Sequence, residues 1–350
     1  MKFLKFKIIL IIAIIVGAVF IHATQIWLDY MVSPQDELLG EMMYFPSGVF
    51  LKSAICDFDM FVANFVWLRA VQYYGHHALT DYHYPWLAHI FNVLFSLDPK
   101  FVKAHRFGGV LISEDGGRPH AAIELLKKAV LCNPEIWGLT YDIGYINYAI
   151  LNDYHEGGKY FKFASLYEGP TGRSIRFAAH SFRKAKEYAL AKHLWKDVLR
   201  SAETERRKET ALRAIRYIQI EEDIEILRGL VKAYITKVGH TPRELMDFVT
   251  RDLLDSIPTE PYGGRYLLKD DSMVTSTTLL FDELELIVKF LNQRITAYSA
   301  AKGRFPTALD DLIKERFVDN IPKNPFGIAY DYDRSQGKVL LPAIINKFEN

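Results

Sequence analysis

The hydrophobic pattern at the start of the chain predicts a membrane-crossing helix within residues 1–30. After MKFLKFK, which holds three lysines, the run IILIIAIIVGAVFIHATQIWL contains no charged residue. About twenty apolar residues are what a helix needs to cross ~30 Å of hydrocarbon. Because lysines precede the run, the tip is expected in the cytoplasm and the rest of the chain outside. A cleaved secretory signal is the alternative, although Ile21-His22-Ala23 matches its cleavage site poorly.

After a linker at 31–63, helical patterns recur with a fixed period over residues 64–205. In AAIELLKKAVLCNP, residues of one helix and its closing proline stand at offsets of 0, 4, 7 and 12. Similar residues recur in steps of 34 or 35: Leu87, Phe91, Leu94 and Pro99; Ala122, Leu126, Ala129 and Pro134; Gly157, Phe161 and Ala164; Ala191, Trp195 and Val198. Small residues fall at or near the points where paired helices would cross: Gly75, Gly109, Gly144 and Ala179. The third unit, with its helical tyrosines, needs an insertion of one residue to stay in register.

This spacing resembles that of tetratricopeptide repeat proteins. The resemblance implies stacked helix pairs that form an α-solenoid with a concave groove, since one pair alone cannot bury its apolar face. The stretches NFVWLRAVQYYGHH (64–77) and LDPKFVKAHRFGGVL (97–111) also resemble a group of membrane-anchored bacterial repeat proteins. A charge-rich helical pattern over residues 206–232 fits capping helices at the end of the solenoid. The expected fold class is therefore mainly α.

The C-terminal region, residues 233–350, carries one pattern twice. A shift of sixty-four residues aligns IPTEPYGGRY with IPKNPFGIAY without a gap. The aligned tail motif consists of Pro258, Pro261, Gly263 and Tyr266 in the first copy and Pro322, Pro325, Gly327 and Tyr330 in the second. Each copy, 233–278 and 279–350, predicts a long helix, a Gly-x-x-Pro stop, a short helix and a short strand or hairpin. The pattern resembles the head of the major pseudopilins of type II secretion, which implies a secretion or pilus-like context.

Charge and motif content narrow the classes of function. The 43 basic and 42 acidic side chains leave a net charge of +1, which gives no general attraction to nucleic acid. Sequence motifs for nucleotide binding, serine or zinc hydrolysis and haem attachment do not occur, so we expect neither catalysis, a cofactor nor a small-molecule substrate. Cys56 and Cys132 form neither a metal spacing nor a disulfide framework, and their redox state stays open.

Four of the eleven histidines lie close together in the sequence, at His76, His77, His83 and His89. Their spacing is not that of a ligand pair on one helix turn. Ordinary histidines at helix ends are therefore expected, and metal binding is the alternative.

A basic face is predicted on the first helix of the fourth repeat. It consists of Arg173, Arg176, His180 and Arg183, which are three or four residues apart and so share one side of a helix. Guanidinium groups pair with carboxylates through two parallel hydrogen bonds, so this face would suit an acidic segment or a C-terminal carboxylate of a protein partner. A solvated cationic face without a partner is the alternative.

These patterns together predict a non-enzymatic scaffold or adaptor. One helix would anchor it in the bacterial inner membrane, with the bulk of the chain in the periplasm or extracytoplasmic space. It would bind protein partners through the repeat groove during assembly of a secretion, pilus-like or other envelope complex. The alternatives are a structural subunit of an envelope or filament assembly and a metal-handling protein.

Overall fold

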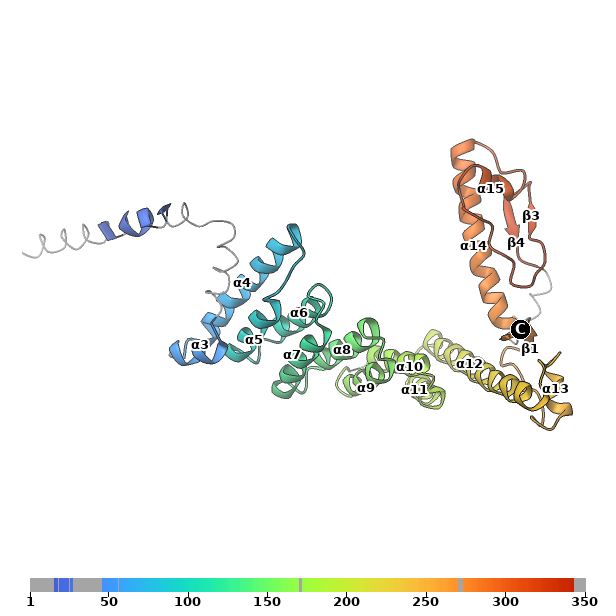
Figure 1. Cartoon of the computed structure of the whole chain (residues 1–350), viewed down its shortest axis with the longest axis horizontal. Helices are drawn as coiled ribbons and strands as arrows, with labels where there is room; N and C mark the ends of the chain where they lie inside the picture. The colour runs from blue at the N-terminus through green and yellow to red at the C-terminus, as the bar shows by residue number, and fades with distance from the viewer. Residues whose placement is uncertain are drawn as a thin grey trace, which may run out of the picture. The chain divides into compact units, whose positions relative to one another are not determined.

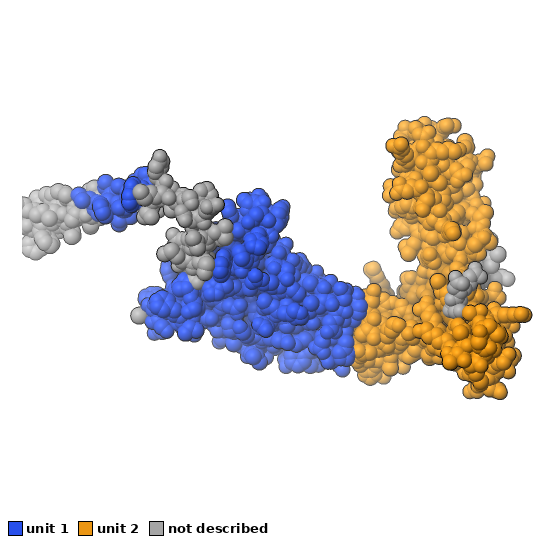
Figure 2. All heavy atoms as spheres, in the orientation of Figure 1, with its two compact units in different colours: residues 1–178 blue, residues 179–350 orange. Residues whose placement is uncertain are grey.

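The computed structural model describes residues 16–17, 19–24, 26–27, 46–55, 57–169, 172–269 and 273–342, and these are mainly α-helical (Figure 1). The prediction of a mainly α fold is confirmed. The chain divides into two units, Met1–Ala178 and Ala179–Asn350, which Figure 2 shows in different colours. The division falls inside the stretch 64–205 that the sequence assigns to repeats.

The first unit is built from helices joined by short turns. Its helices are α3 (Gly48–Ala54), α4 (Asp59–Leu79), α5 (Leu87–Leu97), α6 (Val102–Ser113), α7 (Pro119–Cys132), α8 (Trp137–Tyr145) and α9 (Tyr154–Ala164). α4 packs against α5, α6 against α7 and α8 against α9, while contacts of α5 with α6 and of α7 with α8 join these pairs. The packing buries large side chains of the repeated pattern, including Phe91, Leu126 and Phe161.

Two glycines allow the helices within a pair to approach closely. A Cβ atom at Gly109 on α6 would lie 2.8 Å from Leu126 on α7. A Cβ atom at Gly144 on α8 would likewise lie 2.8 Å from the ring of Phe161 on α9. Both distances are shorter than carbon atoms tolerate in a packed interior, so a side chain there would push the helices apart.

The other small residues of the repeat pattern have different surroundings. Its alanines have no exposed surface: Ala122, Ala129, Ala164, Ala179 and Ala191. At Gly157, a Cβ atom would lie 3.1 Å from the Cβ of Tyr148. Gly75 on α4 faces open space instead, so no close helix contact requires glycine at that position.

One helical turn in the third repeat has hydrogen bonds that span five residues instead of four. After α8, the chain forms the π-helix η1 (Ile146–Ile150), and the N–H of Leu151 donates to the carbonyl of Ile146, five residues earlier. A π-helical turn contains one residue more than an α-helical turn. This turn lies in the third repeat, whose sequence needs one inserted residue to align with the other repeats. The π-helical turn can take up that extra residue within the helix.

The division between the two units falls within α10 (Arg173–Lys184). The second unit continues with α11 (Tyr188–Arg200) and α12 (Glu205–Val238), which pack against each other. The hydroxyl of Thr204 accepts a hydrogen bond from the N–H of Arg207, which fixes the start of α12. The helix ends at Gly239, whose φ of 84° is left-handed and readily adopted by glycine. One uninterrupted helix thus covers the predicted caps at 206–232 and the start of the first tail copy.

Beyond α12, the same order of elements occurs twice. After α12 come α13 (Met246–Thr250), β1 (Tyr266–Lys269) and β2 (Met273–Ser276); after α14 (Thr277–Lys302) come α15 (Asp310–Lys314), β3 (Asp331–Asp333) and β4 (Lys338–Leu340). Both strand pairs are antiparallel, with Tyr266 opposite Ser276 and Asp331 opposite Leu340. The apolar side chains form separate clusters, one containing Phe248 of α13 and the other Leu312 of α15.

Backbone details of the tail also repeat at a distance of sixty-four residues. Gly263 and Gly327 both have a left-handed backbone, with φ of 80° and 73°. The carboxylates of Asp247 and Asp311 each accept hydrogen bonds from two backbone N–H groups that precede the short helix. The prolines of the tail motif are half-buried in both copies: Pro258, Pro261, Pro322 and Pro325.

The two tyrosines of the tail motif make different hydrogen bonds. Tyr266 donates to the buried carboxylate of Asp223 on α12 at 2.6 Å, and Gln219 donates to its other oxygen. Burial, reinforced by this hydrogen bond, raises the pKa of Tyr266. Tyr330 donates instead to the carbonyl of Pro322 within its own loop. In the first copy, strand β1 is therefore tied to the long helix α12 by a buried polar contact. In the second copy, the corresponding tyrosine bonds within its own loop.

The predicted membrane segment lies mostly outside the described residues. Its described parts, 16–17, 19–24 and 26–27, are helical. Within the described ranges, no helix combines the length and the apolar character required to cross a bilayer. The predicted linker at 31–63 includes α3 and the start of α4, so its described part contains helices.

Candidate partner-binding site

Helix α10 contains all four residues of the predicted basic face. Its first turn is fixed by the buried carboxylate of Glu168, which accepts hydrogen bonds from the N–H groups of Arg173 (3.0 Å) and Ser174 (2.5 Å). These N–H groups have no partner within the helix, and a carboxylate there also offsets the positive end of the helix dipole. Glu168 thus caps the start of α10.

The four side chains have different surroundings. Arg173 is exposed, whereas Arg176, His180 and Arg183 are half-buried. Arg183 donates from Nη1 to Glu221 Oε1 on α12 at 2.8 Å and from Nη2 to Nδ1 of His180 at 3.3 Å. Because a guanidinium group can only donate, Nδ1 of His180 carries a lone pair and the ring proton lies on Nε2.

These contacts reduce the positive charge of the face. Burial, together with the nearby charges of Arg183 and Lys184, lowers the pKa of His180, so the imidazole is neutral at pH 7. Arg183 is paired with Glu221, whose pKa is nevertheless raised by burial. In the second unit the predicted face therefore consists of a neutral histidine and a paired arginine.

A pocket of about 370 Å³ lies beside this pair in the second unit, and we call it the Arg183 pocket. Its lining consists of Arg183, Lys184, Lys186, Tyr188, Glu221, Ile224, Glu225, Arg228 and Leu279. Four of these side chains are cationic and two are carboxylates, while a tyrosine and two aliphatic residues form an apolar wall. A positive, partly apolar hollow of this kind suits a carboxylate that is flanked by apolar groups.

Charged contacts hold the walls of the Arg183 pocket in place. Lys186 Nζ lies 2.9 Å from Glu225 Oε1, and this hydrogen bond raises the pKa of Lys186 and lowers that of Glu225. Next to the pocket, Lys192 of α11 contacts Glu222 at 2.5 Å and Gln219 at 2.8 Å on α12. Exposed pairs contribute little to stability. The exposed Lys186–Glu225 pair therefore adds little stability, whereas the half-buried Lys192–Glu222 pair joins α11 to α12.

The sequence prediction includes only one residue of this pocket, Arg183. Lys184 and Lys186 follow it directly in the chain, and this run of cations is the signal that would have extended the predicted site. Glu221 and Arg228 lie on α12, far along the sequence, and no local pattern links them to α10. The structure thus moves the centre of the candidate site from the start of α10 to its end.

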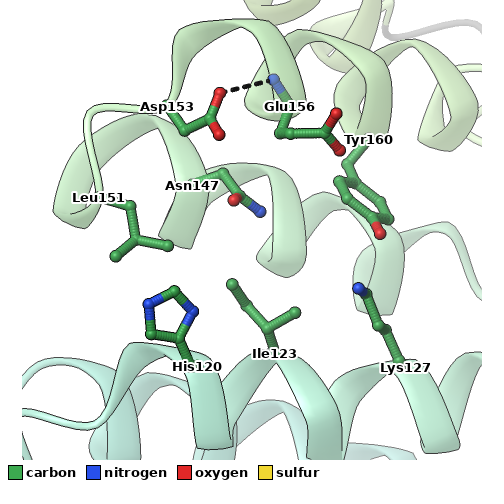
Figure 3. A pocket seen from close by; sticks show the side chains of 8 residues that line it. All are labelled: His120, Ile123, Lys127, Asn147, Leu151, Asp153, Glu156 and Tyr160. Carbon is green, nitrogen blue, oxygen red and sulfur yellow. Dashed lines mark hydrogen bonds between the residues drawn. The ribbon is translucent and has the colours of Figure 1, made fainter.

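A second pocket, of about 400 Å³, lies in the first unit (Figure 3). His120, Ile123 and Lys127 rise from α7 and face Asn147, Leu151, Asp153, Glu156 and Tyr160. Two of the polar groups already have partners: Asp153 caps α9 by accepting from the N–H of Glu156 at 3.0 Å, and Lys127 lies over the ring of Tyr160. Since its two carboxylates, Asp153 and Glu156, outnumber its one lysine, Lys127, this pocket is less suited to an anion than the Arg183 pocket.

The part of the chain that the structure describes holds no group of potential metal ligands at the four histidines or at Cys132. Within that part, no three His, Cys, Asp or Glu side chains are placed to hold one ion. His77 Nδ1 instead contacts Asp81 Oδ1 at 2.7 Å at the end of α4. Cys132 is an exposed thiol without a disulfide partner, and Cys56 lies outside the described residues.

A buried histidine on α6 makes the first unit sensitive to acid. His105 has no exposed surface, and its Nε2 donates to the carbonyl of Asp98 at 2.9 Å, so Nε2 carries a proton. Burial lowers the pKa of His105, because a buried imidazolium loses its hydration. The unfolded chain takes up this proton near pH ~6.5, whereas the folded chain resists it. Stability is therefore retained above that pH and is lost as the pH falls below it.

The substitution His105→Gln is expected to weaken this pH dependence, since a glutamine amide can still donate to the Asp98 carbonyl but does not titrate. Below pH ~6.5, the free energy of unfolding of the wild type should fall by up to about 1.4 kcal/mol per pH unit more than that of the variant. Urea titrations between pH 7 and pH 5 measure the difference. Identical pH slopes for the two proteins would show that His105 takes up no proton on unfolding.

No protein-family model matches this chain, and a search of curated proteins found no match. Its function is therefore inferred from its own geometry and charge.

Proposed function

We propose that this protein is a non-enzymatic, membrane-anchored scaffold that binds protein partners through its helical region. The observation that carries the proposal is the Arg183 pocket, a hollow with an excess of cations and an apolar wall, in which Arg183 is paired with Glu221. The net positive lining of the pocket would attract a carboxylate of the partner, from an acidic side chain or a C-terminus. A positive pocket also speeds the encounter with an acidic partner and excludes basic ones.

A tetratricopeptide-like solenoid is the architecture that we propose for the repeat region. It is supported by the packing of α4 with α5, α6 with α7 and α8 with α9, each pair touching the next. Polar contacts also join first helices of successive pairs, since Arg106 on α6 donates to both oxygens of Asp142 on α8 at 2.6 and 2.9 Å. Stacked pairs of this kind offer a long concave surface for protein partners.

The tail supports a role in a secretion, pilus-like or other envelope assembly on the outer side of a bacterial inner membrane. Each of its two copies has a long helix, a left-handed glycine, a short helix and a hairpin, and this is the order of elements that the proposed resemblance to a pseudopilin head leads us to expect. A structural subunit of an envelope or filament assembly is the second candidate. It is favoured by the separate apolar clusters of the two copies, because independent modules can repeat the same contact along an assembly.

Charge reversal in the Arg183 pocket is expected to abolish partner capture. Lys184→Glu combined with Lys186→Glu changes two exposed side chains and turns the positive lining negative, so a partner carboxylate would be repelled. Lys237→Glu combined with Lys289→Glu makes the same change in net charge at exposed positions outside the pocket. Affinity capture of the full-length protein from detergent-solubilised membranes, followed by quantitative mass spectrometry, measures the bound partners.

Partners bound by the wild type and by the control, but not by the pocket variant, are the expected outcome. Equal capture by all three proteins would contradict the assignment of the pocket. Loss of capture in both variants would show that overall charge, not the pocket, governs binding.

A further inference from the structure

Helix α4 has a broad apolar face that no described residue covers. Its members are Met60, Phe61, Phe65, Leu68 and Val71, and we call them the α4 apolar face. Phe61 is 73 % exposed, Phe65 60 % and Leu68 52 %. Phe61, Phe65, Leu68 and Val71 follow one another at steps of three or four, with Met60 next to Phe61, so they lie along one side of the helix. The same side also carries two uncharged polar residues, Asn64, whose amide donates to the carbonyl of Met60, and Gln72.

The opposite side of α4 provides the contacts with the core of the first unit. Ala63, Val66, Ala70 and Tyr73 are buried, and α4 packs against α5. Trp67 closes one edge, where its ring meets Phe107 of α6 at 5.4 Å between centroids. The α4 apolar face is therefore additional to the surface that folding itself buries.

The composition of this face is not that of a solvated helix surface. The structure describes α4 in full, and its only Asp, Glu, Lys or Arg residues are Asp59 and Arg69. Neither of them belongs to the α4 apolar face. Water-facing sides of helices normally carry charged side chains. Contiguous exposed apolar surface of this kind marks contact with another apolar phase.

We infer that the α4 apolar face lies in the interfacial layer of the membrane that the N-terminal segment is proposed to cross. The inference rests on that proposed anchor. The uncharged run ends at Leu28 and α4 begins at Asp59, so a short tether holds α4 near the bilayer surface. Tethering raises the effective concentration of lipid at the helix, and a weak intrinsic affinity then gives high occupancy. Val49 and Phe50 of α3, the helix that precedes α4 and packs on α5, are exposed as well.

The side chains determine which kind of membrane contact this is. Phenylalanine, methionine and leucine without lysine or arginine insert by burying apolar area, not by attraction to anionic headgroups. The contact is thus expected on zwitterionic as well as anionic lipid and is expected to persist in high salt. It would lay the first unit against the bilayer, with the start of its helical region at the membrane surface.

Depth-dependent fluorescence in the full-length protein tests this inference. Cys56→Ser and Cys132→Ser remove the native thiols, and Phe61→Cys or Leu68→Cys then carries an environment-sensitive label at an exposed site. Glu124→Cys on α7, also exposed, is the matched control. In phosphatidylcholine vesicles we expect a blue-shifted emission at positions 61 and 68 and several-fold stronger quenching by doxyl lipids than at position 124.

The outcomes separate this inference from the proposed anchor. Vesicle flotation reports the anchor: a protein that floats while its label at position 61 stays in water retains the anchor and overturns the inference. A shielded label that doxyl lipids do not quench also overturns it, because a second copy or another protein would then cover the face. A protein that does not float at all contradicts both.

Discussion

Phe161→Ala is expected to lower the free energy of unfolding of the first unit by about 3–5 kcal/mol. The ring has no exposed surface and packs against Tyr141 and Phe177, with centroids 5.0 and 5.4 Å away. It also occupies the space beside Gly144, where α8 and α9 cross. Its removal leaves a cavity that this crossing cannot easily close. Urea denaturation followed by circular dichroism measures the loss.

Phe163→Ala on the same helix is the matched control, since this ring is 47 % exposed. Its effect should stay within about 1 kcal/mol, as is usual for partly exposed positions. If Phe161→Ala were equally mild, the repeated pairing of a small residue with a large one would not be what holds α8 on α9.

Truncation of Phe248 and Leu312 to alanine is expected to loosen two different parts of the tail. Both side chains have no exposed surface and belong to separate apolar clusters. Each substitution should lower local stability by about 2–5 kcal/mol. Phe248→Ala should speed amide hydrogen exchange in β1, β2 and the end of α12, whereas Leu312→Ala should do so in α14, β3 and β4.

In the double variant, the two losses of stability should add to within about 0.5 kcal/mol, because the two sites share no partners. Hydrogen exchange with mass spectrometry on the two single variants and the double variant resolves the two regions. If either single substitution loosened both copies, the tail would have one shared core and the proposal of two separate modules would fail.

Features that depend on neighbouring residues were readable from the sequence. Helical periodicity predicts the mainly α fold, which is confirmed. Gly239 and Gly303, each followed by a proline three residues later, mark the places where α12 and α14 end in left-handed glycines. Such stops depend on the backbone freedom of one residue, so a local pattern is sufficient to find them.

Features that depend on tertiary packing were not readable. The spacing of the basic face places Arg183 on one side of a helix, but its partner Glu221 stands thirty-eight residues later. The neutral state of His180 follows from burial, which a single sequence does not display. The helix α3 inside the predicted linker packs against α5, where Gly48 abuts Ser96, and this contact has no local signal.

Site-specific photocrosslinking in cells tests the role of the Arg183 pocket most directly. A photoreactive phenylalanine analogue in place of Tyr188, which lines the pocket, is expected to form a covalent adduct with a protein partner. The same analogue at Ile226, an exposed position of α12 outside the lining, is the control. The account predicts an adduct at position 188 that is absent at position 226 and disappears when Lys184→Glu and Lys186→Glu are added. No adduct at position 188, or one that survives this charge reversal, would contradict it.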